Sequence, residues 1–440
     1  MSKQTRWLFA EIERWTKEEI VTRDQAARLR ALYPDTAPRV SWGLIVFSGL
    51  GAIVVGLGVI LLLAYNWSEI PKFGKLALIF GSTAAAHAVG LWLRWRAAER
   101  SEIGEAFSLL GTMLFGAGIW LVAQVYNIDE HFPNGFLIWG LGALALAWAL
   151  DSVPQAILAT MTLTIWGCSE VFRFDHPKDF SSVLIFVVVG PLVWRRHSAV
   201  LAAVVLAALY VLILANAGYW SGGGGAFTTA FSLSALLIAA ARLMNDAPAV
   251  VRLRRVIMFF GLCGFVLCSY ILSFDDTVRH VLRWTNDHER STTVFLVYRW
   301  ILFALAAVAW GWLLAERWSG RRRIEVTIEE WLCPIALVYC QGLAVTGYYA
   351  DAQFIALVFN FVCLGVATMW MVRGCRESRL PPVVLGSLFF AALVFARYFD
   401  LFESLAVRGV VFLVLGGVLF AEGFYYRRLR QKNEIAGGQP

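Results

Sequence analysis

Residues 43–64, GLIVFSGLGAIVVGLGVILLLA, form an apolar run with no Asp, Glu, Lys, Arg or His. A transmembrane helix needs about 20 apolar residues to cross a hydrocarbon core of ~30 Å, so this run is long enough to span a membrane. It follows residues 1–42, which are amphipathic and charged. Such a leader is unlike the short basic segment of a cleavable signal peptide, so we expect the run to remain as a membrane anchor.

Runs of the same kind recur along the whole chain and predict about fourteen transmembrane helices. They lie at approximately 43–64, 75–94, 104–125, 135–150, 154–171, 180–194, 198–217, 225–243, 254–273, 294–315, 329–347, 353–372, 382–397 and 405–425. The fourth and sixth runs are short, so they are either tilted spans or re-entrant segments, and the second alternative would reduce the count to twelve.

The composition supports a single membrane domain. Hydrophobic residues make up 59% of the 440 residues and charged residues 16%, with a mean hydropathy of +0.65. Soluble proteins have about 45–50% apolar and ~25% charged residues. The net charge of +7 is spread over short loops and forms no patch, so we expect no nucleic-acid partner. The expected partner is the lipid bilayer.

Basic residues alternate between successive loops, as the positive-inside rule requires of real spans. With both termini placed in the cytoplasm, 28 of the 38 Lys and Arg residues fall on the cytoplasmic side. The outside segments 126–134 and 218–225 contain no Lys or Arg. This pattern predicts a multi-pass protein of the bacterial inner membrane. Glycines 222–225 are interpreted as a flexible outer turn between two spans.

Residues 1–40 predict a short cytoplasmic hairpin of two amphipathic helices. Thr22 and Gln25 match a capping box that opens the second helix. This hairpin either docks on the membrane surface or the protein itself, or binds a protein partner. The predicted organisation is therefore 1–40 hairpin, 41–426 transmembrane helix bundle and 427–440 basic cytoplasmic tail. The sequence does not determine the oligomeric state.

Three polar residues lie deep within predicted spans, where polar groups are costly and often functional: His87, Gln341 and Asn360. A hydrogen bond between helices would explain each of them without any function. His87 differs because an imidazole can exchange protons near neutral pH, as a proton-coupled mechanism requires.

A second set of polar residues surrounds the outer ends of the first and third spans. Small residues at four-residue spacing, such as Ser82, Ala86 and Gly90 or Ser108, Thr112 and Gly116, predict that the first three spans pack closely. Close packing would gather the nearby polar groups into an outer-face pocket, although an ordinary hydrated loop is the alternative. The pocket residues are Asn66, Trp67, Gln124, Tyr126, Asp129, Glu130 and His131.

Recognised enzyme signatures are missing from the sequence. It contains no P-loop, no HExxH and no GxSxG motif, and its seven cysteines lack CxxC spacing. We therefore assign no catalytic residue, metal site, disulfide or cofactor. Glu329 and Glu330 lie at a cytoplasmic span end where solvation is easy, and we assign them no role.

The stretch Leu63-Ala64-Tyr65-Asn66-Trp67, with Ile70, Pro71 and Lys75, resembles a family of predicted bacterial membrane proteins, domain of unknown function number 2157. Gln25-Ala26, Ala123-Gln124-Val125-Tyr126 and Trp139 are similar in the same way, so the resemblance covers roughly residues 1–150. It implies a multi-span membrane protein and gives more weight to Asn66, Trp67, Gln124 and Tyr126. It implies no activity, substrate or cofactor.

Three functions are compatible with these features. The first is permease-like transport of a small solute or lipid, since many spans, short loops and buried polar groups favour it. The second is a membrane scaffold or sensor that docks partners through residues 1–40. The third is an intramembrane enzyme on a lipid-linked substrate, with Asp129, Glu130 and His131 as acid/base groups.

Overall fold

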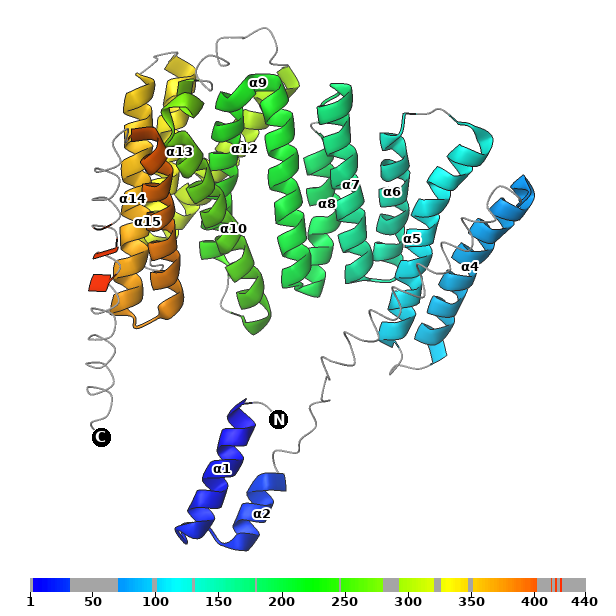
Figure 1. The fold of residues 1–440 in the computed structure, drawn as a ribbon, viewed down its shortest axis with the longest axis horizontal. Helices are drawn as coiled ribbons and strands as arrows, with labels where there is room; N and C mark the ends of the chain where they lie inside the picture. The colour runs from blue at the N-terminus through cyan, green and yellow to red at the C-terminus, as the bar shows by residue number, and fades with distance from the viewer. Residues whose placement is uncertain are drawn as a thin grey trace. The chain divides into compact units, whose positions relative to one another are not determined.

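The computed structural model describes residues 3–31, 70–96, 101–128, 131–178, 180–244, 247–279, 293–319, 326–346 and 351–401, with five further positions between 413 and 421. Within these residues all regular structure is helical (Figure 1). The first predicted span, 43–64, lies outside the described residues, as does most of the last, 405–425. Contacts divide the chain into two units, Met1–Leu78 and Ile79–Pro440, and each is described by itself.

The N-terminal helices form the predicted hairpin. Helix α1 (Lys3–Lys17) and helix α2 (Arg23–Ala31) pack through Ile12 and Ala26, which are both buried. The Thr22 N–H donates to Gln25 Oε1 at 3.0 Å, and the Gln25 N–H donates to Thr22 Oγ1 at 3.3 Å. This reciprocal pair is the predicted capping box, so that prediction is confirmed.

The second unit is a bundle of long apolar helices joined mostly by short connections. After α4 (Lys72–Arg96) and α5 (Ser101–Tyr126) come α6 (Pro133–Ala149), α7 (Val153–Phe174), α8 (Phe180–Arg196), α9 (Ala199–Leu243) and α10 (Pro248–Leu272). The remaining helices are α12 (Thr293–Trp318), α13 (Ile328–Thr346), α14 (Ala352–Arg376) and α15 (Leu380–Leu401).

Seven segments in the described residues are long and apolar enough to cross a membrane. They are Lys72–Arg96, Ile103–Tyr126, Ala199–Trp220, Gly225–Leu243, Val250–Leu272, Phe295–Trp318 and Ala352–Arg376. The predicted fourth run is the shorter apolar helix α6, and the predicted sixth run is α8, which contains Pro191. A total of fourteen spans stays a prediction.

Helix α9 reverses direction within its 45 residues. In a straight helix with a rise of 1.5 Å per residue, Tyr210 and Ser234 would be about 36 Å apart. Their side-chain oxygens are instead 2.9 Å apart. The chain therefore folds back between them, where glycines 222–225 lie, and α9 supplies two antiparallel segments, as predicted for that stretch.

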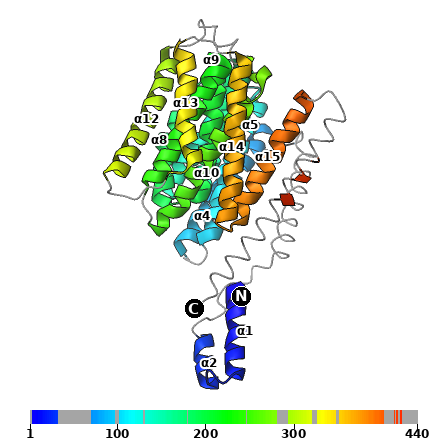
Figure 2. The same ribbon diagram turned by 90° about the vertical axis from the view of Figure 1, so that its left-hand side faces the viewer.

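The two antiparallel segments of α9, which we call its first and second arms, lie at the centre of the helical packing. This helix contacts α7, α8, α10, α12 and α13 (Figure 1). One buried cluster joins α6, α7, α8 and the first arm, and a second joins the other arm to α10, α12, α13 and α14. In the second cluster, Phe231 stacks on Phe359 with ring centroids 5.9 Å apart. Figure 2 shows α14 beside α15, which it contacts extensively.

Large apolar side chains also cover the outside of the bundle. Phe186, Val187, Val308 and Phe361 are each at least 60% exposed. Lipid solvates such side chains well, whereas water does not, and soluble monomers rarely expose so much apolar surface. The exposed surface therefore matches a protein embedded in a bilayer.

Small residues bring α4 and α5 into close contact, as their spacing predicts. A Cβ atom on Gly90 would lie 2.8 Å from the carbonyl oxygen of Gly104 and 2.5 Å from Oγ of Ser108. A Cβ on Gly111 would lie 2.7 Å from the His87 ring. Gly90 is required because even a methyl group would meet the α5 backbone and force the helices apart, whereas a side chain at Gly111 would require the His87 ring to move.

Successive helices run in opposite directions, so the bundle has two ends. One end carries the arginines of the last turns of α4, α8, α9 and α14, and we call it the arginine-rich end: Arg94, Arg96, Arg195, Arg196, Arg242, Arg373 and Arg376. The opposite end, where α5 and α7 finish and α6 and α8 begin, we call the arginine-poor end.

Candidate functional site

A buried carboxylate at the arginine-poor end is the centre of the candidate site. Glu170 is 2% exposed and lies on the buried face of α7, one to four turns beyond Ala156, Ala159, Leu163 and Gly167. Spacings of three and four residues place these side chains on one face of a helix. The apolar stripe that packs α7 therefore carries Glu170 into the protein.

The end of α7 folds the following residues back over this carboxylate. Asp175 takes a left-handed conformation with φ of 53°, which an Asp residue tolerates better than most. The Asp175 N–H and the His176 N–H both donate to the Glu170 carbonyl oxygen, and the His176 nitrogen lies 3.0 Å from it. This is the reversal that commonly ends a helix, and it places His176 and Lys178 beside the Glu170 side chain.

Helix α9 holds the returning chain in place. The Lys178 N–H donates to Oδ1 of Asn216 at 2.8 Å, and the Tyr219 hydroxyl donates to the Asp175 carbonyl oxygen at 2.9 Å. Asn216 is itself buried and donates to the Leu212 carbonyl oxygen one turn earlier on α9. The loop after α7 is thus fixed by its backbone, and its side chains remain partly exposed.

Five side chains make up what we call the Glu170 cluster: Glu170, His131, Trp166, His176 and Lys178. Oε1 of Glu170 is hydrogen-bonded to His131 Nε2 at 2.9 Å and to Trp166 Nε1 at 3.2 Å. Oε2 has Lys178 Nζ at 3.7 Å and His176 Nδ1 at 4.0 Å. A carboxylate with two imidazoles and one ammonium around it can bind a cation or take part in proton transfer.

Of the seven predicted pocket residues, His131 belongs to this cluster. It precedes α6 and contacts the Phe174 ring at 4.1 Å between centroids. Gln124 and Tyr126 are exposed on the last turn of α5. Asn66, Trp67, Asp129 and Glu130 lie outside the described residues, so a pocket between the first and third spans stays a prediction.

The three predicted intramembrane polar residues lie apart in the bundle. His87 is half-buried on α4, whereas Gln341 and Asn360 lie on α13 and α14 at the other end of the row of helices (Figure 1). Nδ2 of Asn360 donates to the Ser273 carbonyl oxygen at 2.9 Å, which joins α14 to α10. Gln341 is buried, and neither of its amide atoms has a hydrogen-bond partner.

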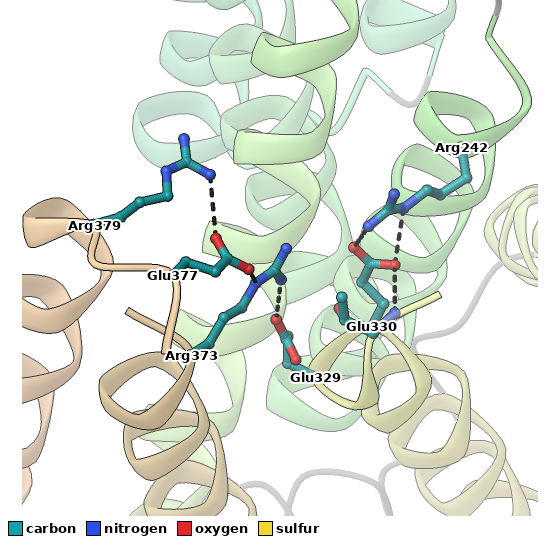
Figure 3. A network of polar contacts seen from close by, with 7 residues as sticks. Arg242, Glu329, Glu330, Arg373, Glu377 and Arg379 are labelled. Atoms are coloured by element: carbon teal, nitrogen blue, oxygen red, sulfur yellow. Dashed lines mark hydrogen bonds and ion pairs between the residues drawn. The ribbon is translucent and has the colours of Figure 1, made fainter. Parts of the chain in front are cut away.

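The arginine-rich end contains an ion-pair network that corrects one interpretation of the sequence. Glu329 and Glu330 begin α13, but they are 6% and 2% exposed, so they are not solvated span ends (Figure 3). Glu330 accepts two hydrogen bonds from the Arg242 guanidinium and one from the Thr327 N–H at 3.2 Å. The last contact caps α13.

Glu329 pairs with a different helix from its neighbour. Nη1 of Arg373 on α14 lies 3.0 Å from Glu329 Oε1, and Nε of the same guanidinium lies 2.8 Å from Glu377 Oε1 (Figure 3). Two consecutive glutamates therefore tie the start of α13 to α9 and to α14. We interpret this network as structural because each of these carboxylates has a charged partner from the protein.

Among the described residues, no three His, Cys, Asp or Glu side chains are placed to share one metal ion. The seven cysteines are all free thiols within the described helices.

The long apolar helices, the apolar exterior and the buried polar groups define an all-helical integral membrane protein with several transmembrane spans. Residues 13–156 match the model of the family described as "Predicted membrane protein (DUF2157)". This match confirms the resemblance seen in residues 1–150. His131 lies within the matched segment, whereas Glu170, His176 and Lys178 follow it. No curated protein and no solved structure matches the chain.

Glu170 is missing from the predicted site residues because it lies within a run, 154–171, that is otherwise chiefly apolar. A detectable signal was present, since Glu170 continues the three- and four-residue spacing of the small and apolar residues of α7. An acidic residue on the stripe that packs a helix is more informative than one at an arbitrary position.

Proposed function

We propose that the protein transports a small solute across the bacterial inner membrane, with its arginine-poor end facing outward. The observation that carries this proposal is the burial of Glu170 on an apolar bundle helix beside two histidines and a lysine. Charged groups in such positions are costly, and they mark ion pathways, substrate sites and proton relays in membrane proteins.

Two features of the bundle support transport. Short connections join several of the helices, such as residues 150–152 and 197–198, which leaves little room there for a soluble catalytic domain. Inside α13, the buried amide of Gln341 retains its full hydrogen-bonding capacity. A polar solute or water that moved along the bundle would find partners at such groups.

The direct test is uptake by purified protein in proteoliposomes under an imposed pH gradient. The panel contains radiolabelled amino acids, amines, sugars and carboxylates, with fluorescent lipids in a parallel scrambling assay. We expect uptake of at least one compound, with an initial rate at least tenfold lower in Glu170→Gln. Glu377→Gln is the matched control, because Glu377 is an exposed carboxylate of the ion-pair network at the arginine-rich end.

Two results would contradict transport. One is protein that is inert towards the whole panel although it is folded and correctly inserted. The other is uptake that Glu170→Gln and Glu377→Gln change equally.

A second candidate function is an enzyme at the outer face. The 2.9 Å contact between His131 and Glu170 favours it, since a carboxylate that orients an imidazole is a common acid/base arrangement. An enzyme would turn over a lipid-linked substrate in detergent without any gradient, and His131→Ala would abolish turnover. Transport without hydrolysis or transfer of the solute would exclude this alternative.

A further inference from the structure

The two oxygens of Glu170 are in unequal surroundings. Oε1 accepts hydrogen bonds from His131 and Trp166. Oε2 is buried and accepts none. The nearest cationic group, Lys178 Nζ, is 3.7 Å from Oε2, whereas an ammonium that donates to a carboxylate normally lies within about 2.7–2.9 Å. Oε2 thus has a nearby positive charge and an unused acceptor.

The side chains near Oε2 lie on the connection after α7, whereas Trp166, one of the two donors to Oε1, lies within the helix. Lys178 and His176 belong to the connection after α7, and their side chains are 31% and 66% exposed. Trp166 is buried within α7. The hydrogen bond from the Lys178 N–H to Asn216 fixes the backbone and leaves the long side chain free to swing outward. An outward turn of the Lys178 side chain would give a ligand access to Oε2 while the Lys178 backbone stays in place.

Aromatic rings lie on the His131 side of the Glu170 cluster. Phe174 lies against the His131 ring, and Phe132 lies 5.4 Å from Phe174 between centroids. The Arg173 guanidinium is 5.2 Å from the centre of the Phe132 ring, so these rings already accept a cation. The cluster therefore combines a buried carboxylate with aromatic rings, and both attract a cation.

We infer that Oε2 of Glu170 binds the primary ammonium group of a small organic amine, which replaces the ammonium of Lys178. Exchange of one ammonium for another leaves the charge beside Glu170 unchanged, so a cation can enter without an uncompensated charge in an apolar environment. Lys178 acts as a tethered competitor that occupies the site in the absence of ligand. This inference deepens the proposed transport function and rests on it for the identity of the transported solute.

The test measures binding of n-butylammonium chloride to the full-length protein in detergent by isothermal titration calorimetry. Because the tethered competitor is removed, Lys178→Met should bind roughly tenfold more tightly than the wild type or better. Lys178→Arg keeps a tethered cation and should bind like the wild type. Lys72→Met removes an exposed lysine at the start of α4 and is the matched control, with unchanged affinity.

Ligand specificity and a second variant complete the experiment. Glu170→Gln should abolish binding, and tetramethylammonium, which has no N–H donor, should bind at least tenfold more weakly than n-butylammonium. Equal affinities in wild type, Lys178→Met and Lys72→Met would overturn the inference even if Glu170→Gln failed to fold. Equal binding of the two ammonium ions would overturn it as well.

The same variants separate this inference from the proposed transport. Amine binding that depends on Lys178, together with inert proteoliposomes, would support the binding site and reject transport. Uptake of an uncharged or anionic solute without any amine binding would support transport and reject the amine site.

Discussion

Loss of the Glu330 charge should destabilise the protein far more than loss of the neighbouring Glu329 charge. Glu330 is almost fully buried and is bound twice by the Arg242 guanidinium (Figure 3). Glu330→Gln keeps the size of the side chain but leaves Arg242 without its counter-ion. Removal of one partner from a buried ion pair costs about 3–5 kcal/mol. The Arg242 side chain is 27% exposed, which favours the lower end of that range, about 3 kcal/mol.

Glu329→Gln is the matched comparison. Arg373 is 44% exposed and retains its hydrogen bond to Glu377 when Glu329 loses its charge. Glu329 itself is buried, but its loss leaves no unpaired charge in the interior because Arg373 is partly solvated and keeps Glu377, so we expect a loss of only about 1 kcal/mol. The measurement is unfolding of each variant in mixed micelles as dodecyl sulfate is increased, followed by tryptophan fluorescence.

A double variant supplies the decisive control. Because an apolar pair of similar volume can replace a buried ion pair at little cost, Arg242→Met combined with Glu330→Met should recover most of the stability lost in either single variant. Equal small losses in Glu330→Gln and Glu329→Gln would contradict the expected difference between the two ion pairs. A double variant no more stable than the singles would contradict the expected recovery of stability.

Three further predictions concern packing, buried amides and pH. Gly90→Ala should lower the free energy of unfolding by about 1–3 kcal/mol because its Cβ would meet the α5 backbone, whereas Gly81→Ala, which has open space, should not. Gln341→Leu should leave the free energy of unfolding unchanged or raise it, since it removes an unpaired buried amide. Asn360→Leu should lower it by about 1 kcal/mol because it removes a hydrogen bond between helices, and equal effects of the two variants in the same micelle assay would contradict this. A hydrogen bond from an α14 guanidinium lowers the pKa of Glu377. The ionised Glu377 carboxylate therefore stabilises the folded protein above the ordinary glutamate pKa, and this contribution is lost as the pH falls through the folded-state pKa. Glu377→Gln should therefore lower stability at pH 7 by under ~1 kcal/mol, and this difference should shrink as the pH is lowered below the ordinary glutamate pKa, as unfolding curves at a series of pH values would show.

The helices were predictable because each depends on residues close together in sequence. The run 353–372 corresponds to α14 at Ala352–Arg376, and the capping residues Thr22 and Gln25 are three positions apart. The glycine run 222–225 also signals its turn locally. Apolar length, alternating basic loops and capping pairs are all visible in short windows of the chain, so the class of protein follows from them.

The candidate site was only partly predictable. His131 was selected from its position in a polar loop, yet its partner Glu170 is 39 residues further along the chain. A span end and a loop do not show which distant carboxylate a histidine will meet. The predicted pocket between the first and third spans depends on residues of which several are outside the described part, and it stays a prediction.

Local sequence accounts for the helical membrane class of this chain, for the bounds of most of its helices and for the hairpin of residues 3–31. The partners of its charges depend on tertiary packing, which pairs Glu170 with His131 and Lys178, and Glu330 with Arg242, 88 residues away. The physical reason is that insertion into lipid depends on local hydrophobicity, whereas the environment of a buried charge depends on which distant helices pack around it.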